Sequence, residues 1–485
     1  MNVNVQVANS KLSDVSFTND QKVAVEGIIE FINAPFNPNK YIVGLCGPGG
    51  VGKTFVTNYI IENCKYSSSV IKCASPTNKA CRVLSQAIGG RKVETIQSLF
   101  GFRLDLKLED FNPDRPQFNP KAKPKLEQVK LLIIDESSML PAKIVTYVAK
   151  TCKEQQIKII FVGDASQLPP VNQRKSIAFD TCSKVFYLNE IVRQEVNNPI
   201  RDLLQLLRDD ISNKTFNFLH YISRHIGESI FNENEEGYLI TNPIGFKSLV
   251  DMSFNDEEFT RNVDKYRMIA YTNIAVSNWN NYIRNKIIKD AHKAILTKND
   301  LIMSNETTVD DFLSEIITNS EEYIVHDIVN YVDNKYGFKG FMVKFQMIHG
   351  GGITTPLFVI DAKDINSIKL YDSILSEFKK AAFNATGGTR VSKWKEYFDF
   401  KNKYLIPCNI LNRDKSIKVQ ASISYGFALT SHKAQGSTYD VVFVDTNDMV
   451  YTKDGKMYTN ADEMLRRLYV GCSRAKKQLI LCYGK

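Results

Sequence analysis

The stretch with the clearest chemistry is a glycine-rich run that ends in a lysine and a threonine. Residues 47–54 read GPGGVGKT and fit the spacing G-x-x-x-x-G-K-[ST] without a mismatch. Glycines let backbone N–H groups close around phosphate oxygens, and the N-terminus of a following helix adds partial positive charge. Lys53 should reach the β- and γ-phosphates, and the Thr54 hydroxyl should hold Mg²⁺. A chance glycine-rich turn is the alternative, but an apolar run before and a helical stretch after favour a triphosphate site. The expected contacts are Gly47, Pro48, Gly49, Gly50, Val51, Gly52, Lys53 and Thr54.

Two carboxylates and a glutamine follow later apolar runs and could act on the same ligand. Asp135 and Glu136 come directly after VKLLII. Asp135 is suited to hold the metal, directly or through water, and Glu136 to orient or deprotonate the attacking water. A pair of ordinary surface carboxylates is disfavoured directly after a buried run. Gln167, in the loop after IKIIFV, could sense the γ-phosphate. These residues predict hydrolysis of a nucleoside triphosphate.

Two arginines further along the chain could complete a hydrolytic site. Arg193 lies in LNEIVRQ, just past the first expected domain, and Arg474 lies in LYVGCSRAK, before the last apolar run. An arginine that reaches across a cleft stabilises charge on the transferring phosphoryl group and links hydrolysis to closure. An ordinary surface salt bridge is the alternative for each.

The elements that must position these residues repeat one pattern in the first half of the chain. Four apolar, β-branched runs end abruptly in small or polar residues, and helical segments usually follow them: YIVGLC, VIKCA, VKLLII and IKIIFV. Such runs indicate a parallel sheet covered by helices on both faces. Because ligands bind at the carboxyl ends of the strands in these sheets, the four polar endings should converge on one edge. The sequence therefore predicts an α/β nucleotide-binding domain.

Similar apolar runs that end in small or polar residues recur in the second half of the chain, in MIAYTN, YGFALTSHKAQGST, DVVFVD and QLILCY. It predicts a second α/β layer, although the two halves share no alignable repeat. A simple kinase or a switch GTPase would not need this layer. Those classes stay open at this point, because hydrolysis alone does not identify the work that it drives.

Composition narrows the class of protein further. The chain has 485 residues, of which 43% are apolar, enough for roughly two to four packed domains. No apolar run approaches the ~18 residues that would span a bilayer, and the N-terminus resembles no export signal. Nine cysteines without a CxxC pair argue against a disulfide framework. We therefore expect a cytoplasmic protein, and the net charge of +9 favours a polyanionic partner without proving one.

Eight motifs in order carry a resemblance to a known family. They are GPGGVGKT, ASPTNKA, TIQSLF, IIDESSM, GDASQLPP, LNEIVRQ, LTSHKAQGST and LYVGCSRA. This set resembles the superfamily 1B helicases, and within them the RecD-like and Dda-like enzymes, over nearly the whole chain. The resemblance implies two RecA-like P-loop NTPase domains with parallel sheets. It also implies an ATP- and Mg²⁺-dependent motor that moves 5′-to-3′ on single-stranded DNA and unwinds duplexes.

The resemblance assigns further residues to the nucleotide and to the nucleic acid. It implies that Gln21 reads adenine, that Arg193 and Arg474 contact the γ-phosphate, and that Gln435 and Gly436 connect the second domain to the nucleotide. It implies nucleic-acid contacts from both domains. Hydroxyl and amide groups at these positions suit binding to the phosphate and sugar of the nucleic acid without sequence preference. An ordinary helix cap is the alternative for Thr95 and Ser98. The expected contacts are Pro76, Thr77, Asn78, Thr95, Ser98, Thr430 and His432.

Residues 100–128 form an expected insertion with one amphipathic strand. Apolar residues alternate with charged ones from Phe102 to Glu109, and NPDRP reads as a turn. A surface hairpin packed on the core is one interpretation. The resemblance favours the small 1B domain, whose pin splits the duplex, with Phe111 or Phe118 stacking on the last base pair.

Residues 291–411 form a second expected insertion, which resembles the SH3-like 2B domain. It contains short β-like runs, a GGG turn and an amphipathic stretch, KLYDSILSEFKKAAF. Trp394 could stack on a base, although burial in a core is the more frequent fate of aromatics at such spacing.

The expected organisation is a RecA-like domain 1A, a 1B pin, a RecA-like domain 2A and an SH3-like 2B insertion. Domain 1A is expected over residues 1–99 and 129–190, and the 1B pin over 100–128. Domain 2A is expected over 191–290 and 412–485, and the 2B insertion over 291–411. A translocase that strips proteins from single strands, without unwinding, is the alternative function, and RNA remains open as a track. The resemblance suggests a monomer that acts with a single-strand-binding protein or replisome components, in phage replication or recombination inside a bacterial host.

Overall fold

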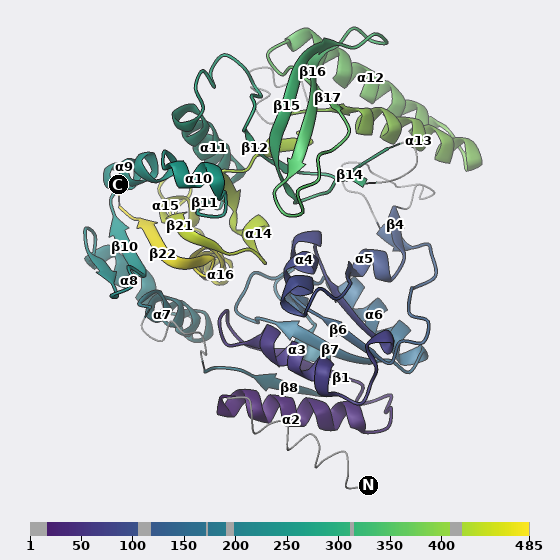
Figure 1. Ribbon diagram of the computed structural model, residues 1–485, viewed down its shortest axis with the longest axis vertical. Helices are drawn as coiled ribbons and strands as arrows, with labels where there is room; N and C mark the ends of the chain where they lie inside the picture. Colours follow the sequence, from purple (N-terminus) through teal and green to yellow (C-terminus); the bar gives the residue numbers. More distant parts are fainter. Residues whose placement is uncertain are drawn as a thin grey trace.

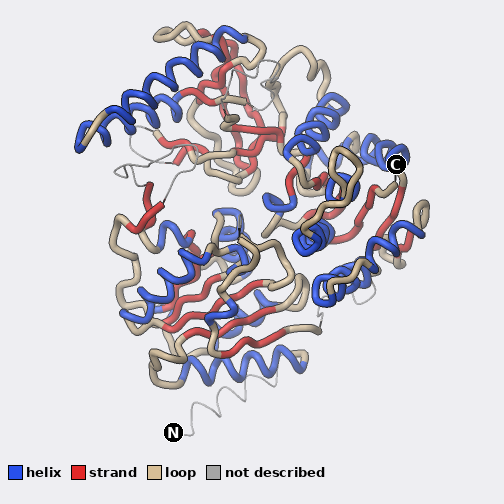
Figure 2. Tube along the Cα trace, turned by 180° about the vertical axis from the view of Figure 1, so that it is seen from behind, coloured by secondary structure: helices blue, strands red, loops and turns tan. Residues whose placement is uncertain are grey.

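Three six-stranded sheets organise the computed structural model, which describes residues 17–104, 118–170, 173–190, 198–310, 315–407 and 420–484 (Figure 1). Each sheet anchors a separate lobe. In both views the lobe of the third sheet lies above that of the first, and the second sheet lies to one side (Figure 2). No helix in the described part of the chain is long and apolar enough to cross a membrane.

The first lobe contains an entirely parallel sheet in the order β3-β2-β6-β7-β1-β8. The four runs expected as strands form β1, β2, β6 and β7, so this part of the fold prediction is confirmed. The strands are β1 (Ile42–Cys46), β2 (Ile71–Ser75), β3 (Val93–Thr95), β6 (Leu131–Ile134), β7 (Lys158–Gly163) and β8 (Lys184–Tyr187).

Alternate side chains of β6 enter different cores, which explains why the whole run is apolar. Leu131 and Ile133 pack under α2, α3 and α4, whereas Leu132 and Ile134 pack under α5 and α6. A sheet covered on both faces requires this pattern. The helices are α2 (Asn19–Asn33), α3 (Lys53–Asn63), α4 (Asn78–Ala87), α5 (Ile96–Leu99) and α6 (Ala142–Glu154), with 3₁₀ turns η1 (Ser68–Val70), η2 (Ser137–Met139) and η3 (Phe179–Thr181).

The second lobe contains the second predicted α/β layer, with the sheet order β20-β11-β21-β22-β10-β9. All its pairs are parallel except β9 with β10 at one edge. The strands are β9 (Ser229–Phe231), β10 (Gly237–Thr241), β11 (Tyr266–Ala270), β20 (Ala428–Thr430), β21 (Tyr439–Asp445) and β22 (Ala475–Cys482). The helices are α7 (Ile200–Asn213), α8 (Asn217–Arg224), α9 (Pro243–Phe254), α10 (Glu257–Arg261), α11 (Asn273–Ile287), α14 (Ser431–Ala434), α15 (Thr446–Val450) and α16 (Ala461–Cys472).

The third lobe contains a largely antiparallel sheet, β18-β17-β16-β15-β12-β19, with a pair of long helices between β17 and β18. Its last strand, β19, lies beyond residue 411, where the insertion was expected to end. The strands are β12 (Leu301–Ser304), β15 (Glu322–Val332), β16 (Lys339–Met347), β17 (Leu357–Ile360), β18 (Tyr404–Leu405) and β19 (Ile423–Tyr425); β13 (Thr308–Val309) pairs with β14 (Glu315–Ile317), and the helices are α12 (Ile365–Asn384) and α13 (Gly387–Lys403).

The second and third lobes share one hydrophobic core. Met268 and Phe443 of the second sheet belong to the same buried cluster as Tyr323 and Phe345 of the third. The chain passes into the third sheet through β12 and leaves it through the neighbouring strand β19, and the Gly426 N–H donates to Leu301 O over 2.8 Å. The second and third lobes are therefore joined by a paired two-strand stem as well as by packing.

The insertion after α5 contains an antiparallel pair, β4 (Phe102–Leu104) with β5 (Phe118–Pro120). The strand expected over residues 102–109 is thus observed for its first three residues. Its remainder, the NPDRP turn and Phe111 lie outside the described residues, as does the side chain of Phe118.

Candidate nucleotide site and nucleic-acid interface

A cavity of about 470 Å³ lies between the first and second lobes. Its walls come from the glycine-rich loop, from the carboxyl ends of β6 and β7, and from α7, α16 and the segment before β21. The expected residues that line it are Gln21, Pro48, Gly49, Gly50, Gly52, Lys53, Thr54, Asp135, Glu136, Gln167, Gly436 and Arg474. Residues more than 400 positions apart in the sequence thus meet in one cavity.

The glycine-rich loop connects β1 to α3 in a conformation that its glycines permit. Gly50 and Gly52 have φ values of 84° and 81°, in the left-handed region that favours glycine. A β carbon on Gly52 would also lie 2.5 Å from Nε2 of Gln21. Lys53 Nζ donates to the carbonyls of Gly47 and Pro48 over 2.8 and 2.7 Å, so the ammonium lies inside the curve of the loop.

Two residues expected on the nucleotide face the protein interior instead. The Val51 side chain is fully buried in the first-lobe core, so only its backbone is available. The Gly47 N–H donates to Gly163 O over 3.1 Å, and a β carbon there would lie 2.5 Å from Leu188 O. Both residues therefore shape the loop without lining the cavity.

Gln21 is held at the cavity wall by a helix cap. Thr18 caps α2, accepting from the Gln21 N–H over 3.2 Å, and the Thr18 N–H donates back to Gln21 Oε1 over 3.2 Å. Gln21 Nε2 donates to Val51 O over 3.0 Å. The side chain is fully buried and connects the start of α2 to the glycine-rich loop.

Asp135 and Glu136 follow β6 directly and lie half-buried at its carboxyl end. Burial raises the pKa of Asp135. Burial, together with the charge of Asp135, raises the pKa of Glu136 to about 7. Glu136 has φ of 49°, unusual outside glycine, and its Oε2 has no hydrogen-bond partner among the described residues. The arrangement leaves one carboxylate oxygen free to accept a proton or hold a water.

The loop after β7 is held from across the cavity. Gln435 Nε2 lies 3.4 Å from Gln167 Oε1 and donates to Leu168 O over 3.3 Å. The Tyr469 hydroxyl of α16 donates to Asp164 Oδ2 over 2.7 Å. Gln435 itself does not line the cavity, so its contact with the nucleotide site runs through Gln167.

Arg474 joins the cavity from the second lobe, between α16 and β22. The guanidinium donates to Val470 O over 3.0 Å, to Ser437 O over 3.1 Å and to Ser473 Oγ over 2.7 Å. Its positive charge acts on the Glu136 carboxyl, where it opposes the rise in pKa. The residue is only 6% exposed and lines the cavity. Arg193 lies outside the described residues.

Sequence reasoning missed several polar residues that line the cavity. Tyr469 lies within the motif LYVGCSRA, so its hydroxyl could have been noticed there. Arg201 and Arg208 of α7 and Lys476 of β22 carry positive charge into the cavity wall. No motif marks Arg201 or Arg208, because only the packing of α7 against α16 brings them to the site. Lys476 ends the stretch LYVGCSRAK, so it could have been noticed there.

The expected nucleic-acid residues cluster at the carboxyl ends of strands in both lobes. Thr77, Thr95 and Thr430 cap α4, α5 and α14, each accepting a backbone N–H over 3.2 Å. Ser75 and Thr95 are partners in the β2–β3 register, so the segment Pro76–Asn78 starts beside Thr95. The helix-cap alternative therefore holds for Thr95. Ser98 is exposed, and its hydroxyl accepts from Lys125 Nζ over 2.9 Å.

His432 lies half-buried in the first turn of α14. Burial lowers the pKa of His432. The negative charge of Glu463 raises this pKa, and the positive charge of Arg467 lowers it. The imidazole is therefore neutral near pH 7 and would act as a hydrogen-bonding group rather than as a cation.

Trp394 does not face a nucleic-acid surface, so the expectation that it stacks on a base is wrong for this structure. The indole is fully buried between α12 and α13, where Phe383 packs edge-on at 5.2 Å between ring centroids and Tyr397 at 5.4 Å. The alternative, a core residue, is what the structure contains. Apolar burial dominates because the two long helices need a large side chain between them.

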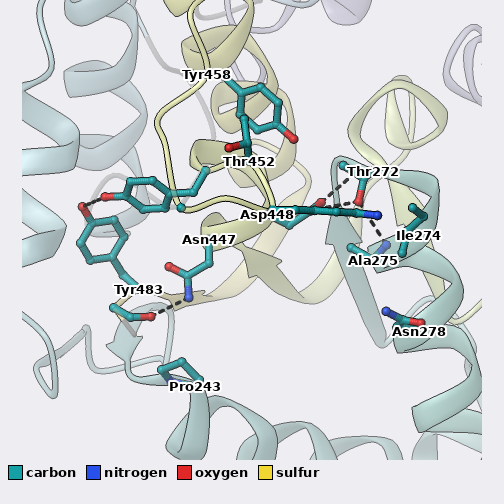
Figure 3. A pocket seen from close by; sticks show the side chains of 14 residues that line it. Pro243, Thr272, Ile274, Ala275, Asn278, Asn447, Asp448, Thr452, Tyr458 and Tyr483 are labelled. Carbon is teal, nitrogen blue, oxygen red and sulfur yellow. Dashed lines mark hydrogen bonds between the residues drawn. The ribbon is translucent and has the colours of Figure 1, made fainter.

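A second cavity, of about 790 Å³, lies elsewhere, on the second lobe (Figure 3). Thr272, Asp448, Tyr458 and Tyr483 are among its lining residues. Asp448 accepts from the Thr272 N–H over 2.8 Å and from its hydroxyl over 2.6 Å. The Thr272 hydroxyl in turn caps α11 by accepting from the Ala275 N–H over 3.1 Å. The expected catalytic groups line the cavity between the first and second lobes instead, so the chemistry of its lining makes that cavity the candidate nucleotide site.

Two family models match this chain, one near each end. A family model described as an AAA domain matches residues 20–224, and one described as a UvrD-like helicase C-terminal domain matches residues 425–482. An uncharacterised protein of Acanthamoeba polyphaga mimivirus is 25% identical over 96% of this chain and 99% of its own length. The ATP-dependent DNA helicase dda of Enterobacteria phage T4 is 25% identical over 90% of this chain and 93% of its own.

Two further similarities extend over most of the chain. The RecBCD enzyme subunit RecD of Buchnera aphidicola subsp. Schizaphis graminum is 23% identical over 95% of this chain and 71% of its own length. A solved Pif1 helicase structure, from work on DNA unwinding at forked double-stranded DNA, has a TM-score of 0.51 with 16% identity. It covers 96% of this chain and 92% of its own, and shows that the two share a fold.

Proposed function

The chain is a superfamily 1B helicase of the Dda-like and RecD-like group, and we propose that it uses ATP to move along single-stranded DNA and to unwind duplex DNA. One observation carries this proposal. Lys53, Glu136 and Arg474 line one cavity from two different lobes. A hydrolytic site divided between lobes can couple each turnover to a change in their relative position.

The residues around the cavity fit a nucleoside triphosphate with a divalent cation. The donor set of a hydroxyl on Thr54 and a carboxylate on Asp135 suits Mg²⁺, which when bound would neutralise charge on the phosphates. A β carbon on Gly49 would meet no atom within 4 Å, so the loop is open on that side. Glu136 keeps a carboxylate oxygen free for the attacking water. Lys53 would exchange its two loop carbonyls for phosphate oxygens.

Arg474 is proposed to stabilise the charge that develops on the γ-phosphate. It reaches the cavity from the lobe opposite the glycine-rich loop, so its contribution depends on the separation of the two lobes. Arg193 is proposed as a second arginine with the same role. Gln167, tied to Gln435 across the cavity, would report the state of the γ-phosphate to the second lobe.

The nucleic-acid track is proposed to follow the helix N-termini at the carboxyl edges of the first two sheets. Pro76–Asn78, Thr95 and Ser98 would contact the strand from the first lobe, and Thr430 and His432 from the second. Threonine hydroxyls and free N–H groups at helix starts bind phosphate and sugar without reading bases. Contacts of this kind support a motor that works on any sequence.

We propose that the three lobes correspond to domains 1A, 2A and 2B, with the β4–β5 insertion as the 1B pin and Phe111 or Phe118 at its tip. Polarity is proposed to be 5′-to-3′. We also propose a monomer that works with a single-strand-binding protein or replisome components.

A tailed-duplex assay tests the proposed activity. The purified chain, ATP and Mg²⁺ are incubated with duplexes that carry a 5′ or a 3′ single-stranded tail, and strand release is measured. Release from the 5′-tailed duplex alone is expected, and release from only the 3′-tailed duplex would overturn the polarity. Loss of unwinding, but not of DNA-stimulated ATPase, on replacing residues 105–117 with a short Gly-Ser turn would support the pin. Undiminished unwinding would exclude it.

A further inference from the structure

Three side chains from three lobes meet in a buried ion cluster beside the first turn of α4. Glu322, the first residue of β15 in the third lobe, accepts from two cations. Its Oε2 accepts from Lys79 Nζ of the first lobe over 2.8 Å, and its Oε1 accepts from Arg267 Nη1 of the second lobe over 2.6 Å. Lys79, Arg267 and Glu322 are 9%, 0% and 3% exposed, respectively. Breaking one partner of a buried set leaves an uncompensated charge, so these contacts are strongly specified.

Tyr439 of β21 completes this cluster, which we call the Glu322 junction (Lys79, Arg267, Glu322 and Tyr439). Lys79 Nζ lies 3.3 Å from the Tyr439 hydroxyl. The tyrosine ring also lies 4.5 Å from Cζ of Arg267, within cation–π range. Lys79 therefore contacts the second and the third lobe at once.

The Glu322 junction connects the two proposed functional segments of the protein. On one side, Lys79 directly follows Asn78, the end of the proposed DNA segment of the first lobe. On the other side, the Tyr439 N–H donates to the carbonyl of Arg474 over 2.9 Å. The first turn of α4 also packs on the segment before β21, because a β carbon on Gly436 would lie 3.6 Å from Cβ of Ala80.

A metal site is an alternative use of the same carboxylates. Asp264, Glu322 and His349 offer ligand atoms within 4.8 Å of one another. Both oxygens of Glu322, however, already accept from cationic side chains, so its charge is compensated without a metal. The cluster is therefore an ionic contact between lobes.

We infer that Glu322 is a positioning residue: by holding Lys79 against Tyr439, it couples DNA bound at Pro76–Asn78 to the placement of Arg474 in the nucleotide cavity. The inference rests on the proposed function. Bound single-stranded DNA that shifts the start of α4 would also move Lys79. Through its contact with Lys79, Tyr439 would transmit that shift to Arg474, whose carbonyl accepts from the Tyr439 N–H. Two sites are coupled when both bias one structural equilibrium, here the seating of α4 on β21.

The test compares steady-state ATP hydrolysis with and without an oligothymidylate for the wild type and Glu322→Gln. The ratio of DNA-stimulated to basal kcat should fall roughly 3- to 30-fold, with basal kcat and the KM for ATP unchanged. Lys79→Met should produce a similar fall. The double variant should be no worse than the poorer single variant, because both changes remove the same contact. Tyr439→Phe, which removes only the hydroxyl, should produce a smaller fall.

Glu321→Gln provides a matched control. Glu321 pairs with Arg82 over 2.6 Å and so joins the same helix to the same segment of the third lobe, through a contact that does not include Tyr439. Its stimulation ratio should equal that of the wild type. A second readout is the Kd for a fluorescein-labelled oligothymidylate with and without a non-hydrolysable ATP analogue. Because coupling is reciprocal, the change in Kd that the analogue causes should be smaller in Glu322→Gln than in the wild type. A general loss of stability would instead lower the melting temperature and leave that change in Kd as it is in the wild type.

The outcomes separate the inference from the proposed function. Absence of DNA stimulation in the wild type would overturn both. Wild-type stimulation that is undiminished in Glu322→Gln would overturn the inference alone. An equal loss in Glu321→Gln would also overturn it, since docking of α4 in general would then be responsible.

Discussion

Glu136 combines three unusual properties at the scale of the single residue. It has a left-handed backbone, it lies beside the negative charge of Asp135, and one carboxylate oxygen lacks a partner among the described residues. Strained backbone at a site is tolerated when surrounding structure holds it, here β6 on one side and the η2 turn on the other. The residue is thus prepared to take a proton from water.

The pH dependence of hydrolysis follows from this environment. Burial and the charge of Asp135 raise the pKa of Glu136 to about 7, so the proton-accepting carboxylate forms only as the pH rises through that value. The kcat/KM for ATP should therefore increase from pH 6 to pH 8 and then level off. Glu136→Gln should be almost inactive at every pH. A wild-type profile that is flat or falling across this range would contradict the role of Glu136 as a base.

Arg474 makes the second prediction at this scale. Arg474→Ala should lower kcat for ATP by roughly 10³-fold, because an arginine of this kind acts mainly on the transition state. Binding of a fluorescent ATP analogue should change far less, since the glycine-rich loop holds the phosphates. Unchanged turnover with intact folding would show that the second lobe takes no part in catalysis.

At the scale of the element, threonine caps connect strand ends to helix starts at the proposed track. Thr430→Ser keeps the cap of α14, whereas Thr430→Val keeps the shape and removes the hydroxyl. We expect Thr430→Val to weaken binding of a fluorescent oligothymidylate several-fold and Thr430→Ser to bind nearly as the wild type does. Fluorescence anisotropy measures both, and equal affinities for the two variants would remove Thr430 from the interface.

The α12–α13 pair offers a contrasting prediction. Trp394→Ala should destabilise the third lobe by about 3–5 kcal/mol, since it removes a fully buried indole. At a temperature where the variant remains folded, its affinity for single-stranded DNA should match the wild type. A loss of affinity without a loss of thermal stability would instead restore the stacking role that the structure excludes.

Sequence spacing predicted many of the residues that line the cavity between the first and second lobes, but it did not predict the contacts between lobes. GPGGVGKT and the carboxylates after β6 were recognisable because each motif lies within a few residues of the strand that presents it. The Lys79–Glu322 pair spans 243 positions, and no local pattern distinguishes either residue from a solvated charge. Trp394 was ambiguous for a related reason: whether an aromatic side chain is buried depends on the packing of two helices, which residue types alone do not determine.

At the scale of the whole molecule, a net charge of +9 and a sequence-independent track predict strong salt dependence. The logarithm of the DNA association constant should fall linearly with the logarithm of salt concentration, by about 0.7 for each phosphate contacted. Titrations of labelled oligothymidylate between low and physiological salt measure the slope. A flat response would indicate mainly apolar stacking on bases.

The stem formed by β12 and β19 has a mechanical consequence. Both ends of the third lobe are attached at one place on the second sheet, and a common core fills the joint. A force applied to the far end of α12 or α13 would therefore be transmitted to the second lobe. The second and third lobes would then turn together relative to the first lobe.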